Sequence, residues 1–125
     1  MLESIRRWAA RNLDDRQVAL LSELTAYARR DILRMTTEAG SGHPGGSLSS
    51  VGIYLLILAA LDAENGDQLV VSHGHTAAGI YAALGRMGFV EPEKVVAGFR
   101  RKGSPYEGHP SLQVPGISWC SGALG

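Results

Sequence analysis

The sequence predicts an incomplete α/β fold, because it contains helical patterns and one strand-like run. Apolar residues recur three or four positions apart over about 18–39, and β-branched residues gather in the short run 68–72. The expected order is helix, helix, strand, helix, helix. Since a lone strand cannot form a sheet, the 125 residues are expected to hold only the first portion of a parallel sheet flanked by helices.

The first two elements are expected to be helices joined by a glycine-rich loop. One apolar stripe marks the first helix: Leu21, Leu24, Ala28, Ile32, Met35 and Ala39. Gly40 is expected to end this helix at the C′ position. After the loop 41–46, Ser47 is the expected N-cap of a second helix over 47–62. This second segment is apolar nearly all round, so we expect it to be buried on more than one side.

The later elements follow from turn signals. Residues 65–67 read Asn-Gly-Asp and precede the short β-branched run 68–72, which favours a buried strand. A third helix is expected to open at His75 and stop at Gly88, and Pro92 to lie in the first turn of a fourth. Residues 102–121 are rich in Gly, Pro and Ser without a clear period, which is typical of a long functional or mobile loop.

Composition limits the possible partners and surroundings. Twelve basic and twelve acidic residues give no net charge, which argues against a nucleic acid or an anionic membrane as partner. Cys120 is the only cysteine, so no internal disulfide is possible, and a cytoplasmic location is expected. The N-terminal stretch is charged throughout, and the longest apolar stretch, 52–61, is about half of a bilayer-spanning helix, so neither secretion nor a membrane span is expected.

The distribution of glycine and histidine points to the candidate chemistry. Residues 1–39 contain no glycine, whereas 40–125 contain all 16 glycines and all four histidines. The histidines fall in three loops: Ser41-Gly-His-Pro-Gly-Gly46, Ser72-His-Gly-His75 and Gly108-His-Pro110. Glycines allow close backbone approach, and the first two loops precede expected helix N-termini, so the loops could converge on one anionic ligand.

The residues alone also allow plainer interpretations. A single Gly-His-Pro is only a turn with a polar residue in it, and His73 could be a surface or capping histidine. His73 and His75 could form a metal pair, but no third ligand stands at an obvious spacing, so no metal ligand is assigned. Cys120 is expected to be a small packed residue.

Several motifs, taken together and in order, resemble the N-terminal part of a transketolase. They read RRDILRM, AGSGHPGGSLS, LVVSHGHTAAGIYAAL, EGHP and PGISWCSGALG, and the resemblance runs from about Leu24 to the last residue. The motifs most resemble those of the N-terminal subunits of split transketolases, in which the diphosphate-binding and pyrimidine-binding domains are separate chains. The resemblance implies an N-terminal extension over 1–17 and the N-terminal portion of the diphosphate-binding domain over 18–125.

The resemblance also implies the site residues. His43, in the S-G-H-P-G motif, would line the cleft above the thiamine diphosphate thiazolium and assist proton transfers on the sugar, with Ser41 beside it as a substrate-binding residue. His75, in the S-x-G-H motif, would contact the cofactor diphosphate and the reacting centre. His109, in the G-H-P motif, would hydrogen-bond a hydroxyl or carbonyl oxygen of the donor. His73 stands where the family commonly has Lys or Asn.

The last motif, Ser121-Gly-Ala-Leu-Gly125, matches the family's T-G-x-L-G and implies further cofactor contacts. The backbone of Gly122 would hold the aminopyrimidine amine, Ala123 would contact the cofactor, and Leu124 would pack on the pyrimidine ring.

The implied activity is transfer of a two-carbon ketol unit from a ketose or ketose phosphate to an aldose, with thiamine diphosphate and Mg²⁺. The family's metal signature, Gly-Asp-Gly followed by Asn, is absent here, so the metal ligands are expected outside this segment. The implied partner is a C-terminal subunit carrying the pyrimidine-binding domain, in an α2β2 assembly.

The chain is expected to be either one segment of a longer subunit or a truncated subunit completed by partners. The alternatives are another thiamine-dependent transferase, such as a deoxyxylulose-phosphate synthase, and a non-catalytic scaffold.

Overall fold

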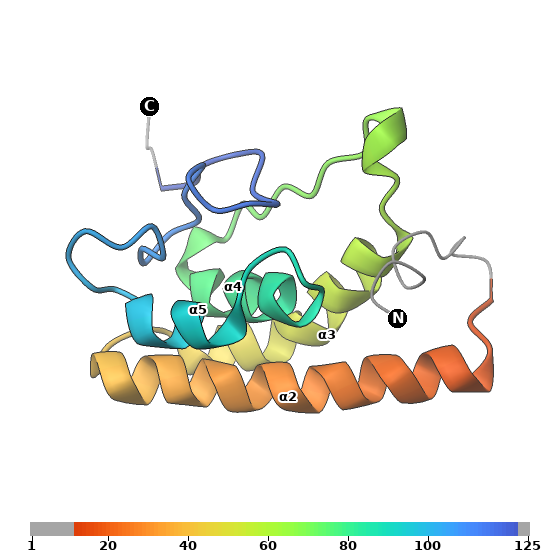
Figure 1. Cartoon of the computed structure of the whole chain (residues 1–125), viewed down its shortest axis with the longest axis horizontal. Coiled ribbons are helices and arrows are strands. Elements are labelled where there is room, and N and C mark those ends of the chain that lie inside the picture. The colour runs from red at the N-terminus through yellow and green to blue at the C-terminus, as the bar shows by residue number, and fades with distance from the viewer. Residues whose placement is uncertain (1–11, 123–125) are drawn as a thin grey trace.

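The computed structural model of the chain describes residues 12–122. Helix α2 (Asp15–Ala39) extends along one side of the molecule, and α3 (Pro44–Ala60), α4 (Ala77–Arg86) and α5 (Pro92–Gly98) lie against it (Figure 1). Two short 3₁₀ turns, η1 (Ala63–Asn65) and η2 (Gly74–Thr76), interrupt the connection between α3 and α4. The long irregular segments lie on the side of the helices that faces away from α2 (Figure 1).

Helix α2 begins earlier than the apolar pattern predicts. The Asp14 carboxylate accepts a hydrogen bond from the Gln17 backbone N–H at 2.8 Å, and the Gln17 side chain accepts one from the Asp14 N–H at 3.0 Å. This reciprocal capping box satisfies two of the orphan donors at the helix start. At the other end Gly40 has φ 60°, which confirms the expected glycine stop.

Helix α3 begins at Pro44 and not after Ser47, so the expected N-cap was wrong. Proline at the first helical position has a pre-set φ and lacks the N–H that would be unsatisfied there, which favours this start. Ser47 lies inside the helix, and its hydroxyl donates to the His43 carbonyl at 2.9 Å. Despite the apolar character of α3, no helix among residues 12–122 is long and apolar enough to cross a membrane.

Helix α4 is the central element of the core, since every residue from Ala77 to Gly85 is buried. It packs against α2, α3 and α5. The core is one cluster of buried side chains from all four helices and from the following loops; its largest members are Tyr81, Phe99, Ile32, Met35, Leu55, Ile80, Leu84, Met87, Val51, Val95 and Val114.

Helix α3 meets the expectation of broad burial only in part. It packs against α2 and α4. A further stripe, consisting of Ile53, Leu56 and Ile57, remains exposed in the described part of the chain. The expected third helix opens with the η2 turn at His75 and becomes α-helical only from Ala77.

The predicted strand over 68–72 is absent: residues 12–122 contain no strand, and the α/β class is not confirmed by them. A strand's backbone groups bond to a neighbouring strand, and the described residues supply none. Leu69 and Val71 pack against the core, whereas the Val70 side chain between them is 56% exposed. The segment therefore buries alternate side chains instead of both faces.

Candidate functional site

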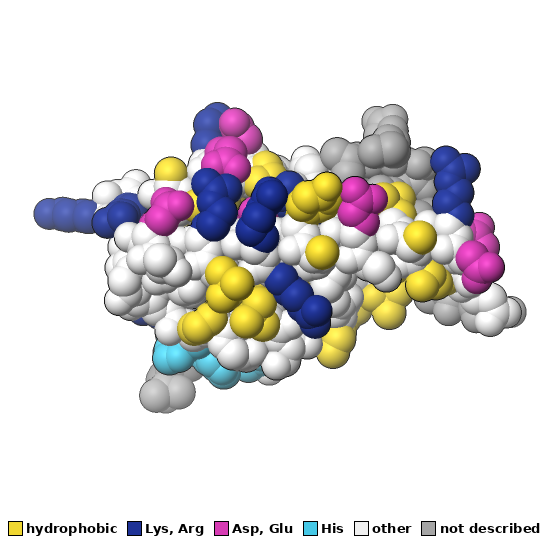
Figure 2. Space-filling model, turned by 90° about the horizontal axis from the view of Figure 1, so that it is seen from below, with side chains coloured by type: hydrophobic (Ala, Val, Ile, Leu, Met, Phe, Trp, Pro, Cys, Tyr) yellow, Lys and Arg dark blue, Asp and Glu magenta, His cyan; other side chains and the backbone are white. Residues whose placement is uncertain are grey.

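The structure brings the three histidine loops and residues 121–122 to one region. The His43 and His75 ring centroids are 5.5 Å apart with perpendicular planes, and those of His75 and His73 are 6.2 Å apart. His109 adjoins the same region through Gly74. All four imidazoles are exposed, and Figure 2 shows histidine side chains gathered at one edge of the molecule.

His43 occupies the N-cap position of α3, yet its side chain makes no capping hydrogen bond. The imidazole therefore does not complete the helix end and remains available at the start of α3. The first turn of a helix presents backbone N–H groups and the positive end of the helix dipole. An exposed imidazole at this end suits contact with an anionic or oxygen-rich small molecule.

His75 lies in the η2 turn, directly before α4, and faces the glycine-rich start of α3. A Cβ atom added at Gly46 would lie 3.0 Å from Thr76 Cγ2 and 3.5 Å from His75 Nε2. The absence of a side chain at Gly46 thus lets the η2 turn approach α3 closely.

His109 lies beside a cradle formed by Gly74, Ser121 and Gly122. A Cβ at Gly74 would overlap Ser121 Oγ and lie 2.7 Å from His109 Cδ2, and one at Gly122 would lie 3.0 Å from the same carbon atom. Gly122 also has φ 97°, a conformation that side-chain-bearing residues rarely adopt. Ser121 Oγ is buried and has no hydrogen-bond partner within the described structure, so this cradle leaves one polar atom for a ligand or water.

Tyr81 anchors the backbone of His109 to the core. Its hydroxyl donates a 2.8 Å hydrogen bond to the His109 carbonyl, and its ring packs edge-on against Phe99 and Tyr106. Burial of the phenol raises the pKa of Tyr81 well above its usual value. A fully buried residue of α4 thus fixes the position of an exposed site histidine.

Arg100 connects two of the loops, although no sequence motif predicts it. Its guanidinium donates to Ser41 Oγ at 2.6 Å, and a Cβ at Gly108 would lie 2.9 Å from one of its terminal nitrogens. Arg100 has φ 54°, the left-handed region that a non-glycine residue seldom adopts. Local patterns miss this contact because the two partners are 59 residues apart in the sequence.

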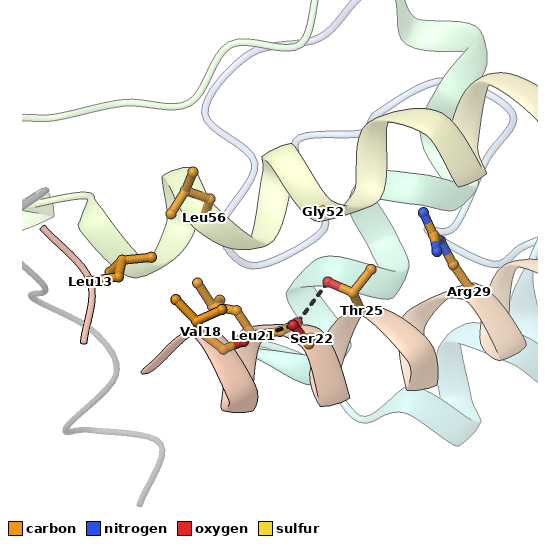
Figure 3. A pocket seen from close by; sticks show the side chains of 8 residues that line it. All are labelled: Leu13, Val18, Leu21, Ser22, Thr25, Arg29, Gly52 and Leu56. Atoms are coloured by element: carbon orange, nitrogen blue, oxygen red, sulfur yellow. Dashed lines mark hydrogen bonds between the residues drawn. The ribbon is translucent and has the colours of Figure 1, made fainter. Parts of the chain in front are cut away.

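Open pockets lie on the surface of the described residues. One of about 510 Å³ borders the site and is lined by Arg100, Arg101, Lys102, Gly103, Ser104, Glu107 and Gly108, so cations predominate on its walls. Another of about 340 Å³ lies between α2 and α3 and is lined by Leu13, Val18, Leu21, Ser22, Thr25, Arg29, Gly52 and Leu56 (Figure 3). No histidine contributes to either lining.

The remaining predicted site residues divide into two groups. Ala123 and Leu124 lie outside the described residues. Within residues 12–122, no three His, Cys, Asp or Glu side chains form a group that could hold a metal ion. Cys120 is exposed, which corrects the expectation of a packed cysteine.

The glycine-lined imidazoles at the starts of α3 and α4 have the chemistry that suits a small anionic or polyhydroxylated molecule. The family model described as transketolase, thiamine diphosphate binding domain, matches residues 22–125. The chain therefore belongs to this family.

Known transketolases are similar to the chain along most of its length. The chain is 31% identical over 120 residues to the transketolase of Mus musculus, which covers 90% of this chain and 19% of that protein. It is 32% identical over 117 residues to one of the subunits of the apulose-4-phosphate transketolase of Phocaeicola vulgatus, covering 87% of this chain and 41% of that polypeptide. Transketolase 1 of Saccharomyces cerevisiae is 31% identical over 96 residues, covering 71% of this chain and 14% of that enzyme. The chain thus spans less than half the length of these relatives.

Proposed function

We propose that this chain supplies the histidine-bearing part of a thiamine diphosphate-dependent transketolase. The reaction is transfer of a two-carbon ketol unit from a ketose or ketose phosphate to an aldose acceptor. The observation that carries the proposal is the convergence of the His43, His75 and His109 loops on one glycine-lined region. Membership of the transketolase family supplies the chemistry that this region would serve.

The residues of the described chain fit one side of a diphosphate cofactor. The cradle at Gly74 and Gly122 excludes side chains from the space beside His109, and the buried Ser121 hydroxyl lacks a partner there. His75 and the backbone of Gly122 are the groups that would hold the cofactor. When bound, thiamine diphosphate supplies the carbon nucleophile and the electron sink for ketol transfer.

The imidazoles would act as general acids and bases on the sugar. Cleavage and formation of a carbon–carbon bond next to a hydroxyl require proton transfers at near-neutral pH, for which histidine is suited. His43 and His109 would donate to or accept from the donor's hydroxyl and carbonyl oxygens. Ser41, held by Arg100, would contribute a further hydroxyl to substrate binding.

The proposal includes groups beyond the described residues. We expect Mg²⁺ to be held by ligands outside this segment, because the sequence lacks the family's metal signature, Gly-Asp-Gly followed by Asn. The similarity to a transketolase that is built from separate subunits supports a partner chain with the pyrimidine-binding domain, in an α2β2 assembly. A cytoplasmic location is also proposed, because a lone, exposed cysteine suits a reducing compartment.

Substitution of the two proton-handling histidines tests the proposal. In the complete enzyme, His43→Ala and His109→Ala should each lower ketol transfer about 100-fold or more, because general acid–base groups contribute at least that much. Circular dichroism and thermal unfolding should remain close to wild type, since both side chains are exposed. Glu23→Gln, an exposed position on α2, is the control and should leave turnover unchanged. Near-normal turnover of both histidine variants would exclude these roles.

Cofactor binding separates the proposal from its alternatives. Titration of thiamine diphosphate and Mg²⁺, with and without the completing polypeptide, should show binding only when the site is complete. Absence of binding in both cases would favour a non-catalytic scaffold. Turnover of pyruvate with glyceraldehyde 3-phosphate, in place of ketose donors, would favour a deoxyxylulose-phosphate synthase.

A further inference from the structure

The side chains of Tyr54, His73 and Thr76 form a hydrogen-bonded ring at the η2 turn, which closes through the backbone carbonyl of His73. Tyr54 Oη lies 2.7 Å from His73 Nε2 and 2.7 Å from Thr76 Oγ1. The Thr76 hydroxyl in turn donates to the backbone carbonyl of His73 at 3.0 Å. The Tyr54 and His73 rings are also stacked, with centroids 6.0 Å apart and planes 28° apart.

Only one set of donors satisfies all three contacts of this ring at the same time. A carbonyl oxygen only accepts, so the single hydroxyl proton of Thr76 is used on the His73 carbonyl. Thr76 Oγ1 must then accept from Tyr54, which uses the single phenol proton. Tyr54 Oη can therefore only accept from His73, and His73 Nε2 must carry a hydrogen.

Two of the three side chains in this ring are buried, so their hydrogen bonds cannot easily be replaced by bonds to water. Tyr54 is 3% exposed and Thr76 is 1% exposed, so neither hydroxyl can exchange its partner for bulk water without cost. His73 itself is exposed and supplies the last donor from the surface. Removal of that donor would leave the acceptor side of a buried phenol unsatisfied.

His75 lies between two members of the hydrogen-bonded ring in the sequence, so the ring holds the turn that carries its side chain. Residues His73 and Thr76 bracket His75, and the Thr76 backbone N–H also donates to the His73 carbonyl at 3.1 Å. Thr76 and His75 both face Gly46, in the first turn of α3, whose N-cap position is occupied by His43. The position of the His75 imidazole, 5.5 Å from that of His43, therefore depends on how this turn is held against α3.

We propose that His73 is a positioning residue, whose Nε2–H acts through Tyr54 and Thr76 to fix the η2 turn and place His75 beside His43. This role rests on the proposed function, because the placement of His75 matters for turnover only if the site binds cofactor and sugar. The sequence alone allows His73 to be a surface, capping or metal-pair histidine. The hydrogen bond between His73 and Tyr54 assigns it the positioning role, and these two residues are 19 positions apart in the sequence.

A direct test is the tautomer of His73, measured by ¹⁵N-coupled NMR on the complete chain. We expect the Nε2–H form in the wild-type protein and a mixture of tautomers in Tyr54→Phe, which keeps the ring but removes the phenol oxygen. The His75 ring signals should shift in Tyr54→Phe and in His73→Leu. They should return toward wild type in His73→Gln, whose side-chain amide can donate. An Nδ1–H tautomer in the wild-type protein, or unchanged His75 signals in both variants, would overturn the proposal.

Kinetics of the complete enzyme provide the second readout. We expect His73→Leu and Tyr54→Phe to lower kcat about tenfold through misplacement of His75, with KM for the sugar donor changed less than about twofold. His73→Gln should retain most of the activity. Wild-type kcat in His73→Leu would refute the positioning role even if the tautomer is as expected. If the wild-type enzyme transfers no ketol unit, the proposed function fails, and the tautomer and the His75 signals still decide the positioning of the turn.

Discussion

At the scale of single residues, Tyr81 is the clearest connection between the core and the site. Its buried hydroxyl donates to the backbone of His109, and burial holds its pKa above the ordinary value of 10.0. A group whose pKa is raised on folding binds its proton more tightly in the native state. Its contribution to stability is therefore present below about pH 10 and is lost as pH rises toward the folded-state pKa.

We predict that Tyr81→Phe destabilises the protein at pH 8 and that this difference shrinks above pH 10. At pH 8 the variant loses one hydrogen bond, worth about 1 kcal/mol. Above pH 10 the wild-type protein alone carries the cost of keeping this phenol protonated, whereas the other alkaline groups titrate in both proteins and cancel. Urea unfolding at pH 8 and pH 10.5 measures the effect. A difference between the two proteins that does not change with pH would contradict the assignment.

The local sequence predicts some of the site residues and not others. His43, His75 and His109 stand out because each lies next to glycine in a short motif, and a motif is a property of neighbouring residues. Arg100 and Tyr81 contact site loops from positions 59 and 28 residues away, so no local pattern marks them. The ring of His73, Tyr54 and Thr76 also depends on the packing of α3 against the η2 turn.

At the scale of elements, the helices could be predicted because their signals are contained in the helices themselves. The apolar period marks α2, and proline marks the start of α5. For α3 the helix was predicted but its start was wrong, because the helix begins at Pro44 and Ser47 lies inside it. The strand prediction failed for a different reason. Residues 68–72 have strand-forming composition, but a strand also needs a neighbour to pair with, and residues 12–122 contain no strand.

A tight contact between α3 and α4 at Gly79 gives an element-scale prediction. A Cβ at Gly79 would lie 3.1 Å from the Ser47 carbonyl oxygen and 3.2 Å from Ser47 Cα, which are backbone atoms and cannot rotate away. We expect Gly79→Ala to destabilise the protein by about 1–3 kcal/mol through overpacking.

Gly52→Ala on α3 is the matched control. Its nearest neighbours are Thr25 side-chain atoms at 3.8 Å, an ordinary contact, so improved helix propensity should stabilise the protein by about 0.5–1 kcal/mol. Opposite signs in chemical denaturation are the expected result. Stabilisation by both substitutions would show that α3 and α4 are not held at this separation.

At the scale of the whole molecule, α4 has the site at one end and an ion pair at the other. Arg86, its last residue, donates from Nε to Asp31 Oδ2 of α2 at 2.6 Å, and its terminal nitrogen contacts the same oxygen. The Asp31 side chain is only 2% exposed, and its second oxygen has no hydrogen-bond partner in the described structure. A second ion pair, Arg34 with Glu93, joins α2 to α5 at the surface.

We predict that these two ion pairs differ sharply in their effect on stability. Arg86→Met would remove the hydrogen-bonded partner of the buried Asp31 carboxylate and leave only the more distant Arg30 guanidinium, 4.0 Å away. This substitution should cost about 3–5 kcal/mol in urea unfolding. Arg34→Met should cost much less, because both members of that pair are solvated. The double variant Asp31→Leu with Arg86→Met should recover most of the loss, since it removes the buried charge together with its partner. Because the pair lies at the end of α4 opposite the η2 turn, the recovered fold should also keep the His43 and His75 ring signals of the wild-type protein. Equal costs for Arg86→Met and Arg34→Met would show that burial of Asp31 does not govern the stability of this helix contact.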